Sequence, residues 1–457
     1  MLRTVSLFVI LLPFAAPARA ADFYVDPQRG DAANDGSAER PWRSLQGVFD
    51  RGLVESRAWD SLPYKEDGTL VPKNAGAPIK AGDTIRLRSG GYGDLLIQSY
   101  YNTGCITIAA AEGHVPRFHS VLLRSSSHWA LKGLHVSPEF GTGKKPRTLI
   151  DLESHGWRGP VHDIVVEDCV LQSAEDTSRW SAEQWNELAS SGIEADGTRI
   201  TLRGNRLKNV NFGISVSASH SLIEHNRVEN FAGDGLRGLG NHCVFQHNVV
   251  KNCYDVNANH DDGFQSWSRG PQGVGTGEVV GIVLRGNTII NFEDPDQPHR
   301  GTLQGIGCFD GMFVDWIVEN NVVVVDHWHG ITLGGARACR IVNNTVIDPN
   351  DQRPGPAAVR VGRHKNGTPS SGCTVRNNLA TGLHVSSGRD MTEDHNLIVD
   401  DPAPVFRDAP GRDFRLRRGS PAIDAGSADL APKTDVAGTS RPQGRAVDVG
   451  AYEYRDE

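Results

Sequence analysis

The chain has 457 residues and a formal net charge of −8. The charged residues are spread along the sequence without a block of Lys and Arg, which argues against nucleic acid as a partner. Length alone allows two or three domains, so the sequence pattern has to decide their number.

The first twenty residues have the pattern of a secretory signal peptide. Arg3 gives a positive start, an apolar run follows from Leu7 to Phe14, and Ala20 ends a small-residue cleavage pattern. The apolar run is too short to span a bilayer. We therefore predict that residues 1–20 are removed and that the mature protein is secreted or periplasmic, with no membrane span. An uncleaved anchor is the alternative.

Seven cysteines are an odd number for an exported protein. Most lie in short apolar segments, which predicts stacked buried thiols. The pair to check for a disulfide is Cys243 and Cys253.

One phrase recurs through the middle of the chain: a polar residue, Asn, any residue, and then Val, Ile or Leu. It occurs at Asn205, Asn226, Asn248, Asn287, Asn321, Asn344 and Asn378. The shorter intervals are close to one turn of a solenoid, and the longer ones fit a turn with an inserted loop such as Asp294 to Thr302. Asn tolerates a left-handed bend, and its side chain can hydrogen-bond along a stack of identical turns.

A second phrase, Gly followed by an apolar residue, recurs in the same turns. If the apolar residue points inward, strand alternation turns the next residue outward. The predicted outward column is Glu194, Ser215, Arg237, Gln265, Gly307, Thr332 and then Arg360. A slip of one residue in this alignment would reverse the faces. The pattern predicts an all-β fold of stacked parallel strands, that is, a parallel β-helix with loop insertions.

The segment from Ser173 to Leu188 interrupts the repeat. Trp180, Trp185 and Leu188 indicate a short amphipathic helix on the outside of the solenoid. It is either a lid beside a groove or a plain surface insertion.

Both ends of the chain resemble exported right-handed β-helix proteins of the pectate-lyase superfamily. The N-terminal motifs are Phe23-Tyr24-Val25-Asp26-Pro27, Arg40-Pro41-Trp42 and Ala81-Gly82-Asp83-Thr84-Ile85. The C-terminal motifs are Ser420-Pro421-Ala422-Ile423-Asp424-Ala425-Gly426 and Gly450-Ala451-Tyr452-Glu453. The resemblance implies one right-handed domain over residues 21–457. Its N-terminal cap and first rungs cover 21–110, the central rungs with the site cover 160–400, and a C-terminal segment covers 401–457. We expect a monomer that binds a polysaccharide.

The densest polar cluster surrounds Asp261 and Asp262, and Asp234 precedes its Gly at the same place one rung earlier. Adjacent carboxylates favour a cation, a proton or a basic partner, and oxygen-rich sites suit Ca²⁺. This stretch resembles the calcium-binding rung of pectate lyases that use a lysine base. Gln265 stands where that family has a further Asp, and the lysine is missing. The resemblance implies Ca²⁺ binding by Asp234, Asp261 and Asp262.

Other residues can supply the missing base and bind the substrate. Candidate catalytic residues are Arg237, His260, Asp262 and His329, although Arg237 could instead form a salt bridge to Asp234 or Asp262. His329 follows Asp234, Asp262 and Gln304 in the column at the strand starts. Candidate substrate-binding residues are Glu194, Gln265, Trp267, Phe309, Arg360 and Arg363. Trp267 and Phe309 occupy the fourth place after Gly in successive rungs, which predicts two outward rings for stacking on sugars.

The first hypothesis is a lyase that cleaves a uronate polymer by β-elimination, and a C5-epimerase would reuse the same groups. The second is an inverting glycoside hydrolase, because Asp234, Asp261, Asp262 and His329 also loosely resemble the polygalacturonase pattern, with two separated carboxylates. A non-catalytic polysaccharide-binding solenoid is the third.

Overall fold

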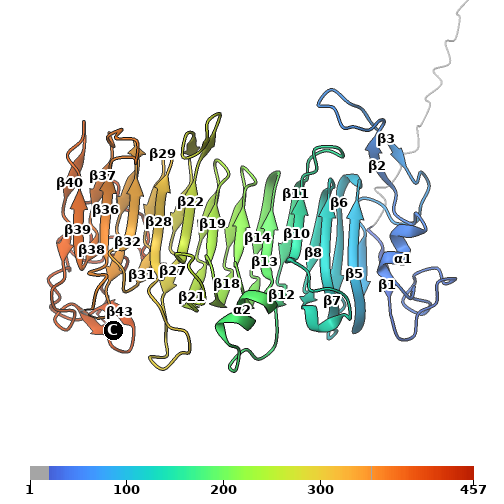
Figure 1. The fold of residues 1–457 in the computed structure, drawn as a ribbon, viewed down its shortest axis with the longest axis horizontal. Helices are drawn as coiled ribbons and strands as arrows, with labels where there is room; N and C mark the ends of the chain where they lie inside the picture. Colours follow the sequence, from blue (N-terminus) through green and yellow to red (C-terminus); the bar gives the residue numbers. More distant parts are fainter. Residues whose placement is uncertain (1–19, 351, 457) are drawn as a thin grey trace, which may run out of the picture.

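The computed structural model describes residues 20–350 and 352–456, so the signal-peptide prediction lies outside the described residues except at Ala20. The strands stack along the long axis of the molecule in chain order, from blue to red in Figure 1. Almost all pairings between successive rungs are parallel. The prediction of an all-β parallel β-helix is therefore confirmed.

Each complete rung contributes one strand to each of three columns. The first column contains β1 (Asp22–Val25), β4 (Thr84–Leu87), β6 (Tyr101–Ala110), β8 (Ser127–Lys132), β11 (His162–Glu167), β14 (Thr198–Arg203), β17 (Leu222–Glu224), β20 (Val244–Gln246), β26 (Val283–Arg285), β30 (Ile317–Glu319), β34 (Arg340–Val342), β37 (Thr374–Arg376) and β40 (Thr392–Asp394). The second column contains β9 (His135–Val136), β12 (Val170–Gln172), β15 (Arg206–Val210), β18 (Arg227–Phe231), β21 (Val249–Cys253), β27 (Thr288–Ile290), β31 (Val322–Val324), β35 (Thr345–Ile347), β38 (Leu379–Ala380) and β41 (Leu397–Ile398). The third column contains β5 (Gly90–Gln98), β7 (Pro116–Arg124), β10 (Thr148–Glu153), β13 (Ser191–Ala195), β16 (Ile214–Val216), β19 (Leu236–Gly238), β22 (Asp262–Trp267), β28 (Gln304–Asp310), β32 (His329–Gly334), β36 (Ala358–Gly362) and β39 (Gly382–Val385).

The turn between the first and second columns carries a ladder of asparagine side chains. Each Nδ2 donates to the Oδ1 of the next Asn at 2.9–3.0 Å. The ladder contains all seven predicted residues, from Asn205 to Asn378, and ends on Asn396. These buried amides also bond to backbone groups, so the ladder satisfies polar atoms inside the turn.

The left-handed bend lies one residue before each Asn, which corrects the prediction. Gly204, His225, His247, Gly286 and Asn320 all have φ between 54° and 66°. The ladder asparagines themselves do not have a positive φ. Their side-chain amides line up with the amides of the neighbouring rungs. A polar residue or Gly at the preceding position fits the left-handed region.

The core runs along the axis and is filled by the inward residue of each strand. In the third column these are Ile193, Ile214, Leu236, Phe264, Ile306, Ile331 and Val359, each at most 2% exposed. One rung cannot cover its own apolar face, so stacking supplies most of the stabilising burial.

Short elements cap the solenoid and decorate its sides. The N-terminal end carries α1 (Leu45–Asp50) and the hairpin of β2 (Ser56–Trp59) and β3 (Leu70–Lys73), and η1 (Pro138–Phe140) follows β9. Small sheets are formed by β23 (Arg269–Gly270) with β24 (Gly273–Val274), by β25 (Glu278–Val280) with β29 (Met312–Val314) and β33 (Ala336–Arg337), and by β42 (Phe406–Asp408) with β43 (Asp413–Leu416). Within the described ranges, no helix combines the length and apolar character needed to cross a membrane.

The cysteines are all free thiols, and six of the seven are buried. Cys105 alone is exposed. The suggested pairing of Cys243 with Cys253 is therefore not present in the structure.

Candidate functional site

The third column presents the predicted row of outward side chains. Strand register pairs Glu194 with Ser215, Ser215 with Arg237, and Arg237 with Gln265. It then continues through Gly307, Thr332, Arg360 and His384. The predicted alignment is confirmed at every step, and neighbouring members lie about 5 Å apart along the axis.

Two buried carboxylates lie at the starts of neighbouring strands. Asp234 is 1% exposed and Asp262 is fully buried. Arg237 Nε donates to Asp234 Oδ2 at 2.5 Å, and the backbone N–H of Asp262 donates to Asp234 Oδ1 at 3.1 Å. The salt-bridge alternative for Arg237 is thus the observed one. Its guanidinium also lies 3.8 Å from the Phe212 ring centroid, so Arg237 is packed as well as paired.

The carboxyl group of Asp262 is held in a space that only glycine leaves open. Asp262 Oδ2 accepts from Gln265 Nε2 at 2.8 Å, whereas Oδ1 is buried and has no partner among the described residues. A Cβ on Gly307 would lie 2.0 Å from this Oδ1 and 3.1 Å from Gln304 Oε1, which is also buried and unpaired.

Burial and the neighbouring charge of Asp234 raise the pKa of Asp262 well above its ordinary value. Burial also raises the pKa of Asp234, but the ion pair with Arg237 opposes this rise. The neighbouring Arg237 cation therefore favours the charged form of Asp234, whereas burial and the charge of Asp234 favour a proton on Asp262. A proton on Oδ1 would make this buried oxygen a hydrogen-bond donor.

Asp261 has its own partners. Its carboxylate accepts from Asn259 Nδ2 at 2.9 Å and from the Cys253 thiol at 3.4 Å. Burial raises the pKa of Asp261 to about 7. Near neutral pH a substantial fraction of this carboxyl therefore carries a proton.

The predicted calcium ligands do not form a compact set. Ca²⁺ requires six to eight oxygens, but Arg237 holds Asp234, while Asn259 and Cys253 hold Asp261. Within the described part of the chain, the ligand atoms of His128, His162 and Asp163 form the one group of three that all lie within 4.8 Å of one another. That group is on the first column, where Arg199 already bonds to both oxygens of Asp163. Calcium binding remains a prediction.

Two histidines stand at the start of β32. The backbone N–H of His329 donates to His327 Nδ1 at 3.1 Å, and His329 Nδ1 lies 3.0 Å from Thr332 Oγ1. Burial, with smaller contributions from nearby charges, lowers the pKa of both imidazoles to about 4. Both rings are consequently neutral at neutral pH. No described residue is hydrogen-bonded to the Nε2 atom of His329.

Arg360 supplies a cation beside these neutral rings. It faces outward next to Thr332 in the column, and its charge helps to lower the pKa of both His327 and His329. It forms no ion pair or hydrogen bond with any described residue. A half-buried guanidinium without a protein partner is suited to a carboxylate from a ligand.

The predicted pair of aromatic residues is partly wrong in register. A β-bulge shifts the pairing after Ser266, so that Trp267 lies opposite Asp310 instead of Phe309. Both rings are half-buried. Phe309 packs against His329 with centroids 4.7 Å apart, and Arg237 lies 5.3 Å from the Trp267 ring.

Three other predicted residues have different surroundings. His260 is exposed, close enough to Asp234 and His327 to affect their pKa values. Glu194 is paired with Arg147 at 3.2 Å. Arg363 is exposed and follows the end of β36, outside the row of outward residues.

The predicted helix is α2 (Ala182–Leu188), which begins with a capping box at Ser181. Trp185 is 1% exposed and packs against Tyr254 in a tilted arrangement, with the ring centroids 4.7 Å apart. Asn186 Nδ2 donates to Val256 O at 3.0 Å. The helix therefore holds the loop that leads to Asp261. It has a structural role that a plain surface insertion would lack.

Two pockets flank the His329 centre along the third column. One, of about 310 Å³, lies toward the N-terminal end and is lined by Arg147, Asn186, Glu194, Phe212 and Arg237, among others. The other, of about 410 Å³, is lined by Thr332, Arg360, His384, Ser386 and Glu393 with neighbouring residues. We interpret these two pockets and the row of outward residues between them as one extended groove.

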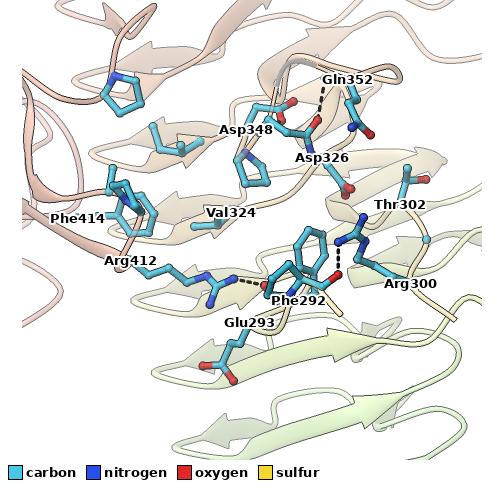
Figure 2. A pocket seen from close by; sticks show the side chains of 18 residues that line it. Phe292, Glu293, Arg300, Thr302, Val324, Asp326, Asp348, Gln352, Arg412 and Phe414 are labelled. Atoms are coloured by element: carbon cyan, nitrogen blue, oxygen red, sulfur yellow. Dashed lines mark hydrogen bonds between the residues drawn. The ribbon is translucent and has the colours of Figure 1, made fainter. Parts of the chain in front are cut away.

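A larger cavity, of about 690 Å³, lies over the second column (Figure 2). Its polar groups are mostly occupied by the protein itself. Arg300 and Arg412 donate to backbone carbonyls of Pro295 and Phe292, and Asp348 accepts from two backbone N–H groups. We interpret it as the junction between the 292–302 insertion and the C-terminal segment.

The sequence interpretation missed the chemical importance of His327, Gln304 and Gly307. The phrase His327-Trp328-His329 was an available signal, since two histidines separated by one residue at a strand start can share one site. The unpaired oxygens beside Gly307 depend on side-chain geometry and leave no sequence signal.

The comparison with solved structures finds the following three proteins, among others, similar to this chain. The pectate lyase Pel9A is 15% identical, with 95% of this chain and 96% of that chain covered and a TM-score of 0.47. A GH136 lacto-N-biosidase from Eubacterium ramulus is 14% identical, with 82% and 68% covered and a TM-score of 0.46. XylC in complex with xylose is 8% identical, with 94% and 98% covered and a TM-score of 0.49.

No curated protein matches the sequence. Residues 191–352 match the family model described as the right handed beta helix region. These residues include β13 to β35, the rungs that carry the acid pair and both histidines. The fold is accordingly a right-handed parallel β-helix, as the resemblance at the two ends of the chain implied.

Proposed function

We propose that this protein is a carbohydrate-active enzyme that cleaves an acidic polysaccharide by β-elimination. The observation that carries the proposal is the placement of a neutral imidazole, His329, beside Arg360, a cation that pairs with no described residue and lines the neighbouring pocket. β-Elimination needs a base in its neutral form and a positive group that neutralises the uronate carboxylate.

The steps balance without an external reactant. Arg360 binds the carboxylate, which makes the proton on the adjacent carbon acidic. His329 accepts that proton at Nε2 while its Nδ1–H donates to Thr332 Oγ1. The electron pair of the C–H bond forms a carbon–carbon double bond, and the glycosidic oxygen leaves. His327 accepts a hydrogen bond at Nδ1, so its neutral ring carries the proton at Nε2 and can donate a hydrogen bond to the leaving oxygen. The leaving oxygen takes up the proton that His329 removed from carbon, so both imidazoles end neutral.

The two buried carboxyl groups, Asp234 and Asp262, orient the side chains that face the substrate. Asp262 holds Gln265, and Asp234 holds Arg237, so the outward groups of two successive rungs have fixed orientations. Substrate contact is assigned to Arg237, Gln265 and Trp267, and the buried carboxylates are assigned a positioning role.

An inverting hydrolase is the second candidate, favoured by Asp261. A carboxyl with a pKa of about 7 keeps enough proton near neutral pH to act as a general acid. In that case a second carboxylate would have to activate water.

The experiment follows ultraviolet absorbance and new reducing ends together, on polygalacturonate, alginate and neutral glucans, with calcium or with chelator. Absorbance that rises with reducing ends supports elimination, whereas reducing ends alone support hydrolysis. His329→Ala should lower kcat by about 10²–10⁴-fold, the usual contribution of a general base. His395→Ala, an exposed histidine on the first column, is the matched control. Unchanged activity in His329→Ala would overturn the assignment. Activity lost with chelator and restored by calcium would support the predicted metal.

A further inference from the structure

The pocket at the N-terminal end of the groove has a charge opposite to that of the whole protein. The chain carries a net charge of −8. Four cations and one carboxylate line this pocket: Lys144, Lys145, Arg147, Arg237 and Glu194. Such a local excess of positive charge concentrates anionic ligands, and a concave wall strengthens the effect.

Two segments that interrupt the regular rungs build this pocket together. Lys145 Nζ donates to the carbonyl of Ala189, which caps α2, at 2.8 Å. Ser190 Oγ donates to Pro146 O at 2.6 Å, and the backbone N–H of Ser191 donates to Arg147 O. The loop with the basic residues is thus fastened to the end of α2 and to the start of β13.

The cations of the pocket are unequally engaged. Arg147 is paired with Glu194, and Arg237 is paired with the buried Asp234. The ammonium of Lys144 is exposed and makes no hydrogen bond or ion pair with a described residue. Phe212 and Asn186 add an aromatic surface and an amide at the same place. A free cation, an aromatic ring and amides are the groups that bind an anionic sugar.

The row of outward residues connects this pocket to the proposed catalytic centre. Arg237 belongs to both the pocket and the row, and three strand steps separate it from Thr332. At about 4.8 Å per step this distance is roughly 14 Å. A sugar chain that lies along the axis covers this distance with a few residues.

We propose that this pocket is a distant subsite for an anionic sugar unit of the substrate. It fixes the register of a long chain on the enzyme, so that cleavage occurs several residues from the unit bound there. The proposal rests on the proposed function for its second part, while binding of an acidic polysaccharide can be tested independently of any reaction.

The test uses the full chain with Lys144→Glu, and with Lys144→Ala plus Lys145→Ala. Binding is measured first, by affinity electrophoresis in polygalacturonate and in heparin, in a His329→Ala background that removes turnover. Both variants should bind about tenfold more weakly, with the loss reduced at high salt. Lys80→Ala, an exposed lysine outside the pocket, should bind normally. If the variants bind only polygalacturonate more weakly, the anion in the pocket is a carboxylate. If they bind only heparin more weakly, the anion is a sulfate.

Kinetics then separate the subsite from the catalytic centre. In the active background, kcat/KM should fall about tenfold for long chains and stay unchanged for disaccharides, which are too short to reach the pocket. Unchanged binding in the Lys144→Glu variant, with a normal melting temperature, overturns the subsite. If the wild-type protein cleaves none of these polymers but the variants still bind them more weakly, the proposed reaction is wrong and the subsite proposal stands.

Discussion

The Nδ1 atom of His327 accepts a hydrogen bond from the backbone N–H of His329, with the two nitrogens 3.1 Å apart. This contact fixes the neutral tautomer of His327, because an accepting nitrogen carries no proton. Protonation of the ring at Nδ1 would break the bond and place a cation close to Arg360. The contact therefore acts in the same direction as burial, which lowers the pKa of both histidines.

We predict that activity is lost only in strong acid. With a pKa of about 4, His329 stays neutral above that pH and loses its function as a base when the pH falls below it. The measurement is kcat/KM against pH, which should rise with unit slope through about 4 and then level off. A midpoint near 6.5, the ordinary value for histidine, would contradict this assignment.

Stability should depend on pH with opposite signs for the histidines and for Asp261. The unfolded state binds more protons at the histidines between about pH 6.5 and 4, so their contribution to stability is lost as the pH falls through that window. The folded state instead holds a proton on Asp261 up to about pH 7, so this contribution is lost as the pH rises from about 4 to 7. Melting temperatures should show that Asp261→Asn removes the second dependence and keeps the first. An unchanged pH profile in that variant would rule out protonation of Asp261.

The repeat made much of this architecture predictable. The sequence repeats once per rung, with Asn at one corner and Gly before an inward residue. This repeat determines which strands align in a column and which side chains point inward or outward. For this reason the outward row from Glu194 to Arg360 is correct at every step. Residues whose environment is set by the repeat can be placed from the sequence.

The departures occur where the repeat is locally broken. A bulge after Ser266 moves Trp267 opposite Asp310, and alternation alone does not reveal an extra residue in one strand. The burial of Asp262 and the pairing of Arg237 depend on the shape of inserted loops. The sequence limited the roles of Asp262 and Arg237 to a few alternatives. Their hydrogen bonds and burial in the structure were needed to choose among these alternatives.

Arg237→Met should destabilise the fold by about 3 kcal/mol or more, because it leaves the carboxylate of Asp234 buried without its partner. The double variant Asp234→Asn with Arg237→Met should recover part of this loss, since the buried charge is then removed. Urea denaturation of both variants and of the wild type gives the free energies of unfolding. Equal destabilisation in the single and double variants would mean that packing of Arg237 on Phe212 dominates.

The asparagine ladder predicts a position-dependent loss of stability. Asn248→Ala removes hydrogen bonds to Asn226 and Asn287 within a fully buried turn. We expect a loss of about 2–4 kcal/mol, because several buried backbone and amide groups lose their partners. Asn396→Ala, at the half-exposed end of the ladder, should cost clearly less. Chemical denaturation compares the two, and similar losses would argue against the ladder as the cause.

Gly307→Ala tests the crowded space beside the acid pair. The new Cβ would lie 2.0 Å from Asp262 Oδ1, so the carboxyl has to move and its bond to Gln265 is disturbed. We expect a loss of about 1–3 kcal/mol in stability, typical of overpacking, together with a fall in kcat. Gly91→Ala is the matched control in the same column, where nothing lies within 4 Å of the added carbon. If both variants keep full activity and stability, the position of the Asp262 carboxyl has no influence on the groove. If only Gly307→Ala loses activity while its melting temperature stays within a few degrees, the carboxyl acts by orienting the outward residues above it.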